Sequence, residues 1–150
     1  MIIRGYNEID LPGILDLLEE LRGSSDGARF DIYLKDSGTY KNTYLKEKNY
    51  NVLIAKEDDR IVGFMISEHY DNDTVGLLML YVGLQHRRKG IAKQLKNEME
   101  LFCRVKGYKK IVSRVRTNNK ESIALNIKSG WVKQIDKIYP DFYYEFRKYL

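Results

Sequence analysis

Four stretches of the chain carry the hydrophobic pattern of a helix. The first predicts an amphipathic helix from about residue 11 to residue 21, whose apolar face contains Leu11, Ile14, Leu15, Leu18 and Leu21. A longer stretch from Gly90 to about residue 105 predicts a helix whose apolar face contains Ile91, Leu95, Met99, Phe102 and Val105. Two shorter helices are expected over residues 37–48 and from Asn119 to Lys128, the latter closed by Gly130.

Shorter apolar runs between these helices predict β-strands. Residues 75–82 form a nearly unbroken apolar run, which is typical of a central strand buried on both faces. Asp58-Asp59-Arg60 is expected to form the turn of a hairpin. The remaining strands are expected at Ile2–Arg4, Asn51–Lys56, Ile61–Glu68, Lys110–Arg116, Val132–Ile138 and Phe142–Tyr149. This order of elements predicts a mixed α/β domain built around one sheet.

Length and composition exclude several classes of protein. A chain of 150 residues is typical of one domain, which we expect to span residues 1–150. The single cysteine, Cys103, excludes a disulfide framework, and with only two histidines no metal site is expected. No apolar run approaches the roughly 20 residues that span a bilayer, and the N-terminus lacks the pattern of a signal peptide. We therefore expect a soluble cytoplasmic protein without a membrane partner.

The net charge of +5 conceals a strong asymmetry between the two halves of the chain. Residues 1–75 carry 9 Lys and Arg against 15 Asp and Glu, whereas residues 76–150 carry 17 against 6. Such a basic half suggests an anionic partner, for example a phosphorylated cofactor or a nucleic acid. Because no motif with interleaved basic and aromatic residues is present, nucleic acid is not the expected partner.

A polar loop between the central strand and the long helix is the candidate anion site. It reads Gly83-Leu84-Gln85-His86-Arg87-Arg88-Lys89-Gly90. A helix N-terminus offers backbone N–H groups and the positive end of the helix dipole, which together bind phosphate. Gly90 lets the backbone approach an anion closely, and three cations precede it. The alternative is a basic loop that only keeps the start of the helix soluble.

Two segments resemble the motifs of the GCN5-related N-acetyltransferase (GNAT) superfamily. Arg87-Arg88-Lys89-Gly90-Ile91-Ala92 is similar to the Q/R-x-x-G-x-G/A motif, which opens the long helix after the family's fourth strand. Residues 119–131 are similar to the N-x-x-A-x-x-x-Y-x-K-x-G-F segment further along. Together with the order of elements, the resemblance covers essentially the whole chain. It implies a central mixed, mostly antiparallel sheet with splayed fourth and fifth strands, flanked by about four helices.

The resemblance also implies acetyl-CoA, or another acyl-CoA, as the cosubstrate. In the family pattern the backbone N–H groups of the first motif wrap the pyrophosphate, and the end of the fourth strand pairs with the pantetheine arm. The Leu80 amide would polarise the thioester carbonyl, Asn119 would bind the pantetheine, and Lys128 would reach the adenosine end. The expected cofactor-binding residues are Leu80, Tyr81, Val82, Arg87, Arg88, Lys89, Gly90, Ile91, Ala92, Asn119, Ser122, Asn126 and Lys128.

The chain departs from the family pattern at Asn126, where the family has a Tyr that acts as general acid. An amide has no proton to give up near neutral pH. Three alternatives stay open. Another tyrosine is the acid, with Tyr139, Tyr143 and Tyr81 as candidates; or no acid is needed, because a thiol with a pKa of about 8.5 leaves readily as a thiolate; or the protein binds acyl-CoA with little turnover.

The acceptor amine has to lose a proton before it attacks, so a general base is expected. Glu68 is the first candidate and His69 the second, at the end of the third strand. Alternation along the strand points the two side chains to opposite faces, so only one faces the cleft. The alternative is that both are surface residues. The expected catalytic residues are Glu68, Leu80 and Tyr139.

Several other residues carry a bland interpretation. Cys103 and Trp131 are expected to pack in the core. Tyr33, Tyr40, Tyr44, Tyr139, Tyr143 and Tyr144 flank the regions that form the acceptor cleft in GNAT relatives. Their rings either bind a cation or pack against neighbouring elements.

We therefore expect an N-acetyltransferase that moves an acetyl group from acetyl-CoA directly to a primary amine. The tyrosines and the acidic first half of the chain, including Asp26, Asp31 and Asp36, favour a small cationic amine or polyamine over a protein amine. The alternative is an acyl-CoA-binding regulatory module with little turnover, which Asn126 supports. The resemblance also allows a homodimer.

Overall fold

The computed structural model describes residues 1–22 and 49–150, which form a mixed α/β fold. In these ranges seven strands make one sheet, in the order β1-β2-β3-β4-β5-β7-β6. β4 and β5 run parallel, whereas the pairs β1–β2, β5–β7 and β6–β7 are antiparallel. The predicted mixed sheet is therefore confirmed. The strand bounds are β1 Ile2–Gly5, β2 Tyr50–Glu57, β3 Arg60–His69, β4 Thr74–Val82, β5 Lys110–Arg116, β6 Val132–Ile135 and β7 Tyr143–Tyr149.

Three of the four expected helices lie in the described ranges, and all three form. They are α1 Leu11–Arg22, α4 Ile91–Lys106 and α5 Lys120–Lys128. One-turn 3-10 helices, η1 Glu8–Asp10 and η4 Leu84–His86, precede α1 and α4. The helix expected over residues 37–48 lies outside the described residues, as does the predicted break at Gly23–Gly27.

The described residues group into two compact units that are interleaved along the chain. One unit lies within residues 1–67 and 79–99, and the other within residues 68–78 and 100–150. The chain thus passes from one unit to the other within β3, within β4 and within α4. A single domain over residues 1–150 stays a prediction.

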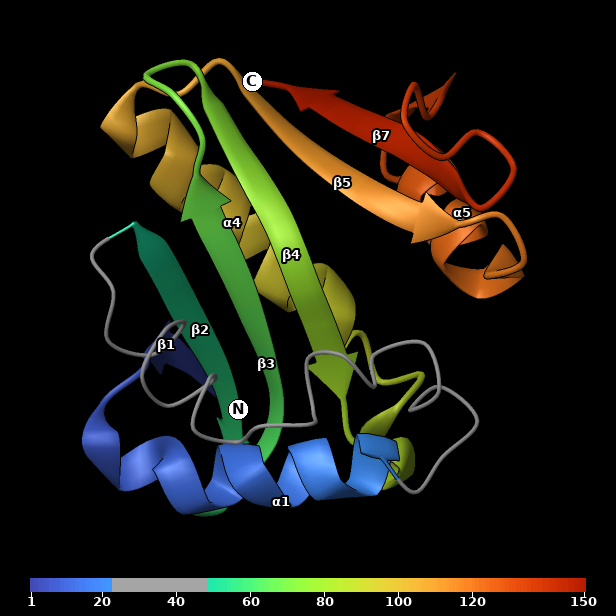
Figure 1. The fold of residues 1–150 in the computed structure, drawn as a ribbon. Helices are drawn as coiled ribbons and strands as arrows, with labels where there is room; N and C mark the ends of the chain where they lie inside the picture. The colour runs from blue at the N-terminus through green and yellow to red at the C-terminus, as the bar shows by residue number, and fades with distance from the viewer. Residues whose placement is uncertain (23–48) are drawn as a thin grey trace. The chain divides into compact units, whose positions relative to one another are not determined.

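In the first unit, α1 lies crosswise to β2 and β3 (Figure 1). Its apolar face is buried at Ile14 and Leu21, as the helical spacing predicts. Gly13 permits the close approach, because a Cβ at this position would lie 2.5 Å from a side-chain carbon of Ile61 in β3. The helix therefore packs directly on the start of β3.

The turn between β2 and β3 is a two-residue turn at Asp58 and Asp59. Both residues have positive φ angles, 46° and 64°, which is the conformation of a type I′ hairpin turn. Aspartate tolerates this conformation better than most residues do. The predicted hairpin is confirmed, and Arg60 already belongs to β3.

In the second unit, β5 and β7 lie side by side over their full lengths (Figure 1). β6 was expected to continue to Ile138 but ends at Ile135. The reason is Asp136, whose buried carboxylate accepts the N–H groups of Ile138 and Tyr139 at 2.9 and 2.8 Å and turns the chain. Phe142 likewise lies outside β7, which starts one residue later.

The buried face of α4 differs from the predicted one at its C-terminal end. Ile91, Leu95 and Met99 are buried as expected, but Val105 is 78% exposed. Cys103 takes the fourth place instead, because residues four apart lie on one face of a helix. Burial, together with the charge of Glu100, raises the pKa of this thiol to about 11, so Cys103 packs in the core and does not react.

The pairing between β4 and β5 is short. It runs from Thr74↔Lys110 to Leu77↔Ser113, although β4 continues to Val82 and β5 to Arg116. Within the described part of the chain, β5 pairs beyond this point only with β7. This is the splay of the fourth and fifth strands that the sequence predicts.

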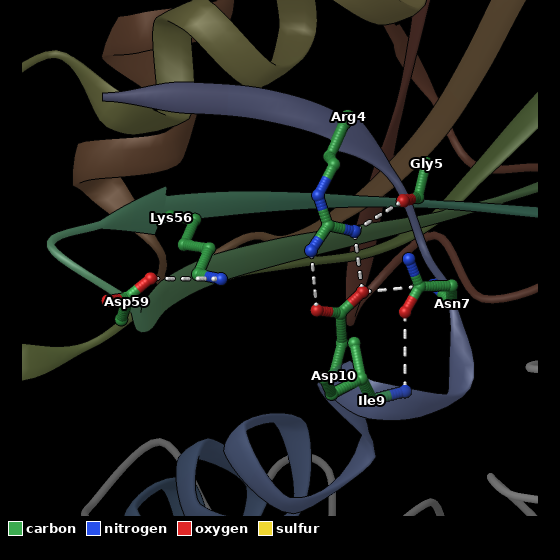
Figure 2. Close-up of polar contacts among 7 residues, drawn as sticks. All are labelled: Arg4, Gly5, Asn7, Ile9, Asp10, Lys56 and Asp59. Atoms are coloured by element: carbon green, nitrogen blue, oxygen red, sulfur yellow. Dashed lines mark hydrogen bonds and ion pairs between the residues drawn. The ribbon is translucent and has the colours of Figure 1, made fainter.

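An ion pair joins β1 to the start of the first helical segment (Figure 2). The guanidinium of Arg4 donates to both carboxylate oxygens of Asp10, at 2.7 and 2.8 Å. Asp10 also accepts the backbone N–H of Asn7 at 2.9 Å, and the Asn7 side chain accepts the N–H of Ile9, which makes a capping box. The hydrogen bonds from Arg4 hold the pKa of the buried Asp10 below its ordinary value.

Among the described residues, no helix has the length and apolar character to cross a membrane. The same residues hold no cluster of three or more His, Cys, Asp or Glu that could bind a metal ion.

We expect Asp10→Asn to lower the free energy of unfolding at pH 7 by about 1–3 kcal/mol, because the buried acceptor loses its charge. Since the folded pKa of Asp10 lies below the unfolded value of about 3.9, this stabilisation is present above that pH. It is lost as the pH falls through the folded pKa. Thermal unfolding of both proteins from pH 2 to pH 7 measures the difference, and Asp16→Asn, on the exposed side of α1, is the control. An Asp10→Asn difference that is equally large at pH 2 would contradict this account.

Candidate functional site

The loop between β4 and α4 is built from short local hydrogen bonds. The N–H of Gly83 donates to the carbonyl of Val62 at 2.8 Å, which keeps the end of β4 against β3. The N–H of His86 then donates to the carbonyl of Gly83 and closes the single turn of η4. Arg88 and Gly90 have positive φ angles of 62° and 80°, so the chain turns sharply into α4.

Gly90 is the N-cap of α4, because its carbonyl accepts the first helical hydrogen bond, from Gln94 at 3.0 Å. A glycine has no side chain that could accept the N–H groups of the first helical turn. A Cβ built on Gly90 would meet no atom within 4 Å, so the backbone is open here. Arg88 and Lys89 beside it are exposed, and the buried Ile91 anchors the start of the helix.

Taken together, the loop holds the groups that bind a phosphate. Backbone N–H groups and the positive end of the α4 dipole meet two exposed cations at an open glycine. Ala92, in the first turn, is small and half-buried, so no long side chain projects from that position. The residues present therefore fit a pyrophosphate group chemically, as the sequence motif implies.

Arg87 differs from its two neighbours. Its Nε donates to the carbonyl of Val82 at 3.1 Å, and its guanidinium lies over the ring of Tyr81, 5.4 Å from the centroid. The side chain therefore contacts the end of β4 and joins the loop to the strand. The sequence motif predicts a cation at this position but does not predict this contact.

The main-chain groups at the end of β4 alternate in direction. Because Gly83 donates to β3, the groups of Tyr81 also face β3, and those of Leu80 and Val82 face the opposite side. This is the side on which the pairing with β5 has already ended. The carbonyl of Val82 accepts from Arg87, so Leu80 contributes the main-chain N–H and carbonyl that suit an added extended segment.

Tyr81 itself is 4% exposed, and its hydroxyl donates to Oε2 of Glu20 at 3.2 Å. The other oxygen of this carboxylate, Oε1, accepts the N–H of Leu84 at 3.2 Å. Glu20 lies on α1, more than 60 residues before both partners. No spacing in the sequence relates these positions, so the contact could not be found without the fold.

The second predicted motif forms α5 and its two caps. The side chain of Asn119 accepts the N–H of Ser122 at 3.2 Å, and its NH2 group can still donate to a ligand. Asn126 is 1% exposed, and Lys128 is exposed in the last turn. Gly130, with φ +83°, ends the helix, and Trp131 beyond it is buried, as expected for a packing residue.

The two candidate bases lie next to each other in β3 with different surroundings. Glu68 is half-buried, whereas His69 is exposed. Nδ1 of His69 lies 2.6 Å from the hydroxyl of Tyr108, and burial raises the pKa of that tyrosine. His69 is thus engaged with Tyr108, which leaves Glu68 as the stronger candidate of the two.

Two tyrosines of the C-terminal region form an aromatic pair. Tyr139 follows the Asp136 turn, is 51% exposed, and meets Tyr143 edge-on with 6.2 Å between the ring centroids. Arg116 lies over the other ring at 5.7 Å, and Lys133 lies over Tyr144 at 4.6 Å. These rings already carry cations from the chain itself. Tyr33, Tyr40 and Tyr44, and with them Asp26, Asp31 and Asp36, lie outside the described residues.

Comparison with curated proteins finds a relative in human N-acetyltransferase 8. The two sequences are 28% identical over 103 residues, which cover 65% of this chain and 45% of the relative. The match thus spans less than half the length of the human protein.

Three solved structures illustrate the fold that the chain shares. PaiA N-acetyltransferase from Thermoplasma acidophilum, in complex with coenzyme A, has a TM-score of 0.79 at 22% identity and covers 96% of each chain. The GNAT domain of PAT from S. lividans has a TM-score of 0.82 at 13% identity, over 99% of this chain and 89% of that one. A GNAT family acetyltransferase from Elizabethkingia anophelis, with acetyl-CoA bound, has a TM-score of 0.72 at 19% identity, over 99% and 97%.

A sequence model of the acetyltransferase (GNAT) family matches residues 14–131, which is most of the chain. The match begins in α1 and ends at Trp131, just after α5, so it includes both segments that the sequence singled out. From this match, and from a fold shared over almost the full length of solved acetyltransferases, the chain belongs to the acetyltransferase (GNAT) family.

Proposed function

We propose that the protein transfers an acetyl group from acetyl-CoA directly to a primary amine. The observation that carries the proposal is the loop before α4, with its open N-cap glycine and exposed Arg88 and Lys89. Membership of the GNAT family supports it, as do the coenzyme A and acetyl-CoA in two structures of the same fold. The acceptor amine, a homodimer and a cytoplasmic location stay predictions.

Acetyl-CoA supplies an acetyl group activated as a thioester. The backbone N–H groups of Gly90 to Ala92 bind its pyrophosphate, with Arg88 and Lys89 adding charge. The main-chain groups of Leu80 face away from β3 and hydrogen-bond the pantetheine arm or the acyl carbonyl. In the second motif, the NH2 group of Asn119 and the side chains of Ser122, Asn126 and Lys128 complete the binding set.

Two proton transfers remain for the chain to manage. We assign removal of the amine proton to Glu68, because it is half-buried while its neighbour His69 contacts Tyr108. For the leaving sulfur we assign no side-chain acid, since Asn126 has no proton to give and a thiol has a reference pKa of about 8.5. Tyr139 is the alternative acid, because its ring is half exposed. Tyr81 is less suitable because its hydroxyl donates to Glu20.

A cationic amine acceptor suits the charge of the first half of the chain. Residues 1–75 carry an excess of six acidic side chains over basic ones, whereas the half with the proposed cofactor loop is basic. Opposite charges on the two substrates would then meet matching fields on the protein. We therefore propose a small polyamine-like acceptor before a protein amine.

Gly90→Trp should abolish binding of acetyl-CoA, because the indole would occupy the space in front of the first-turn N–H groups. For the wild-type chain, ligand at 100 times Kd stabilises the folded state by about 2.7 kcal/mol, which raises Tm by roughly 5–10 °C. Thermal-shift titrations with acetyl-CoA, CoA and ATP measure the difference.

Gly107→Trp is the matched control for this experiment. Gly107 follows the other end of α4, has a φ angle of +85°, and also has open space around it, so the backbone strain is alike. We expect this variant to keep the full thermal shift. If Gly90→Trp keeps it as well, or if the wild-type chain shows none at millimolar acetyl-CoA, the cofactor assignment is wrong.

Glu68→Gln should lower kcat by about 10²-fold or more and remove the acidic limb of the pH–rate profile, because a glutamine cannot accept the amine proton. Release of CoA over a panel of amines, with a polyamine included, measures both. His69→Ala serves as the comparison and should keep the profile. An acidic limb that persists in both variants would exclude the two residues.

Tyr139→Phe should leave kcat within about twofold of wild type, because the thiolate leaves without a general acid. Tyr143→Phe, at the partner ring, is the matched control. A loss of about 10² in kcat for Tyr139→Phe alone would make Tyr139 the acid. Saturable CoA binding with no thiol release from any amine would instead favour the acyl-CoA-binding module.

A further inference from the structure

Glu20 is the one residue of α1 whose carboxylate is recorded to bridge the end of β4 and the start of the cofactor loop. Oε2 accepts the hydroxyl of Tyr81, and Oε1 accepts the backbone N–H of Leu84, both at 3.2 Å. Tyr81 is the second-last residue of β4, and Leu84 is the first residue of η4. A single carboxylate thus spans the corner at which the strand becomes the loop.

The Tyr81 side chain is held at two points. Glu20 accepts its hydroxyl, and the guanidinium of Arg87 lies over its ring. Arg87 also donates to the carbonyl of Val82, on the residue next to Tyr81. The contacts therefore form a chain from α1 through the strand end to Arg87, which immediately precedes the exposed Arg88 and Lys89.

The charge of Glu20 has the wrong sign for a direct role in anion binding. A carboxylate close to a phosphate site repels the ligand, and in a partly buried setting this repulsion is not negligible. Its two hydrogen bonds act in the opposite sense, because they order backbone that would otherwise lose conformational entropy when the ligand binds. Hydrogen bonds to a charged acceptor are also the stronger kind.

We propose that Glu20 is a positioning residue that holds the loop from Leu84 to Gly90 in the conformation that binds the pyrophosphate of CoA. The inference rests on the proposed function, since it concerns the same loop. It adds a residue of α1, outside both sequence motifs, to the determinants of cofactor affinity. Glu20 acts through Tyr81 and Leu84 and does not itself contact the ligand.

The test compares Glu20→Ala, Glu20→Gln and Tyr81→Phe with wild type by isothermal titration of CoA, at a temperature where all are folded. Glu20→Ala loses both hydrogen bonds, and we expect its Kd to rise about tenfold. Tyr81→Phe loses one and should show a smaller rise. Glu20→Gln should stay close to wild type, because its amide oxygen accepts from Leu84 and its NH2 group donates to the Tyr81 oxygen.

Glu19→Ala is the matched control, because Glu19 is the preceding residue of α1 and is exposed. If charge alone mattered, Glu20→Ala, Glu20→Gln and Glu19→Ala would all bind CoA more tightly than wild type, and this would overturn the proposal. A lower Tm for Glu20→Ala with an unchanged Kd would also overturn it, since that is the result of a merely structural role.

Amide hydrogen exchange at Leu84 gives a readout that needs no ligand. We expect faster exchange in Glu20→Ala and unchanged exchange in Glu19→Ala and Glu20→Gln. Equal exchange in all of them overturns the proposal. If wild type binds CoA and Glu20→Ala binds it equally well, this inference alone fails. If wild type binds no CoA, the proposed function fails and takes the inference with it.

Discussion

The early end of the pairing between β4 and β5 is the constraint on which the proposed chemistry depends. Main-chain N–H and carbonyl groups in a sheet need partners, and β4 has them on the side of β3. On its other side the recorded pairing stops at Leu77, although the strand runs on to Val82. The family's use of this strand end for a ligand follows from that geometry, since an extended ligand can complete the ladder as a further strand would.

The loop that follows has to be rigid and open at once, and the described contacts explain how it is both. Gly90 leaves the helix start accessible because it has no side chain. The rigidity comes from outside the loop, through hydrogen bonds to Glu20 on α1 and to Val62 on β3, and through the contact of Arg87 with β4. Anion-binding N–H groups and the structures that hold them thus come from different parts of the sequence.

Much of this was accessible from the sequence, and the exceptions have definite physical causes. Helix and strand periods identify α1, α4, α5 and most strands, because burial imposes those periods locally. β6 ends early because a carboxylate captures two backbone N–H groups, and Val105 is exposed because the buried face of α4 follows fourfold spacing to Cys103. Neither effect appears in hydrophobicity alone.

The candidate site divides in the same way. The two motifs are local strings, so Gly90 and Asn119 could be placed at helix starts from the sequence alone, and the fold bears this out. Contacts between distant segments, such as Glu20 with Tyr81, or the use of Arg87 on a carbonyl, leave no trace in local spacing. The choice between Glu68 and His69 likewise depended on Tyr108, a neighbour that only the tertiary structure brings near.

The burial of Cys103 has a practical consequence for following turnover. The chain has one cysteine, and its thiol is fully buried with a pKa of about 11, so almost none of it is thiolate near neutral pH. Chromogenic disulfide reagents react with thiolates that they can reach. The thiol of released CoA would then be the fast-reacting one in solution, and a continuous colorimetric assay would report each transfer with little background from the native protein.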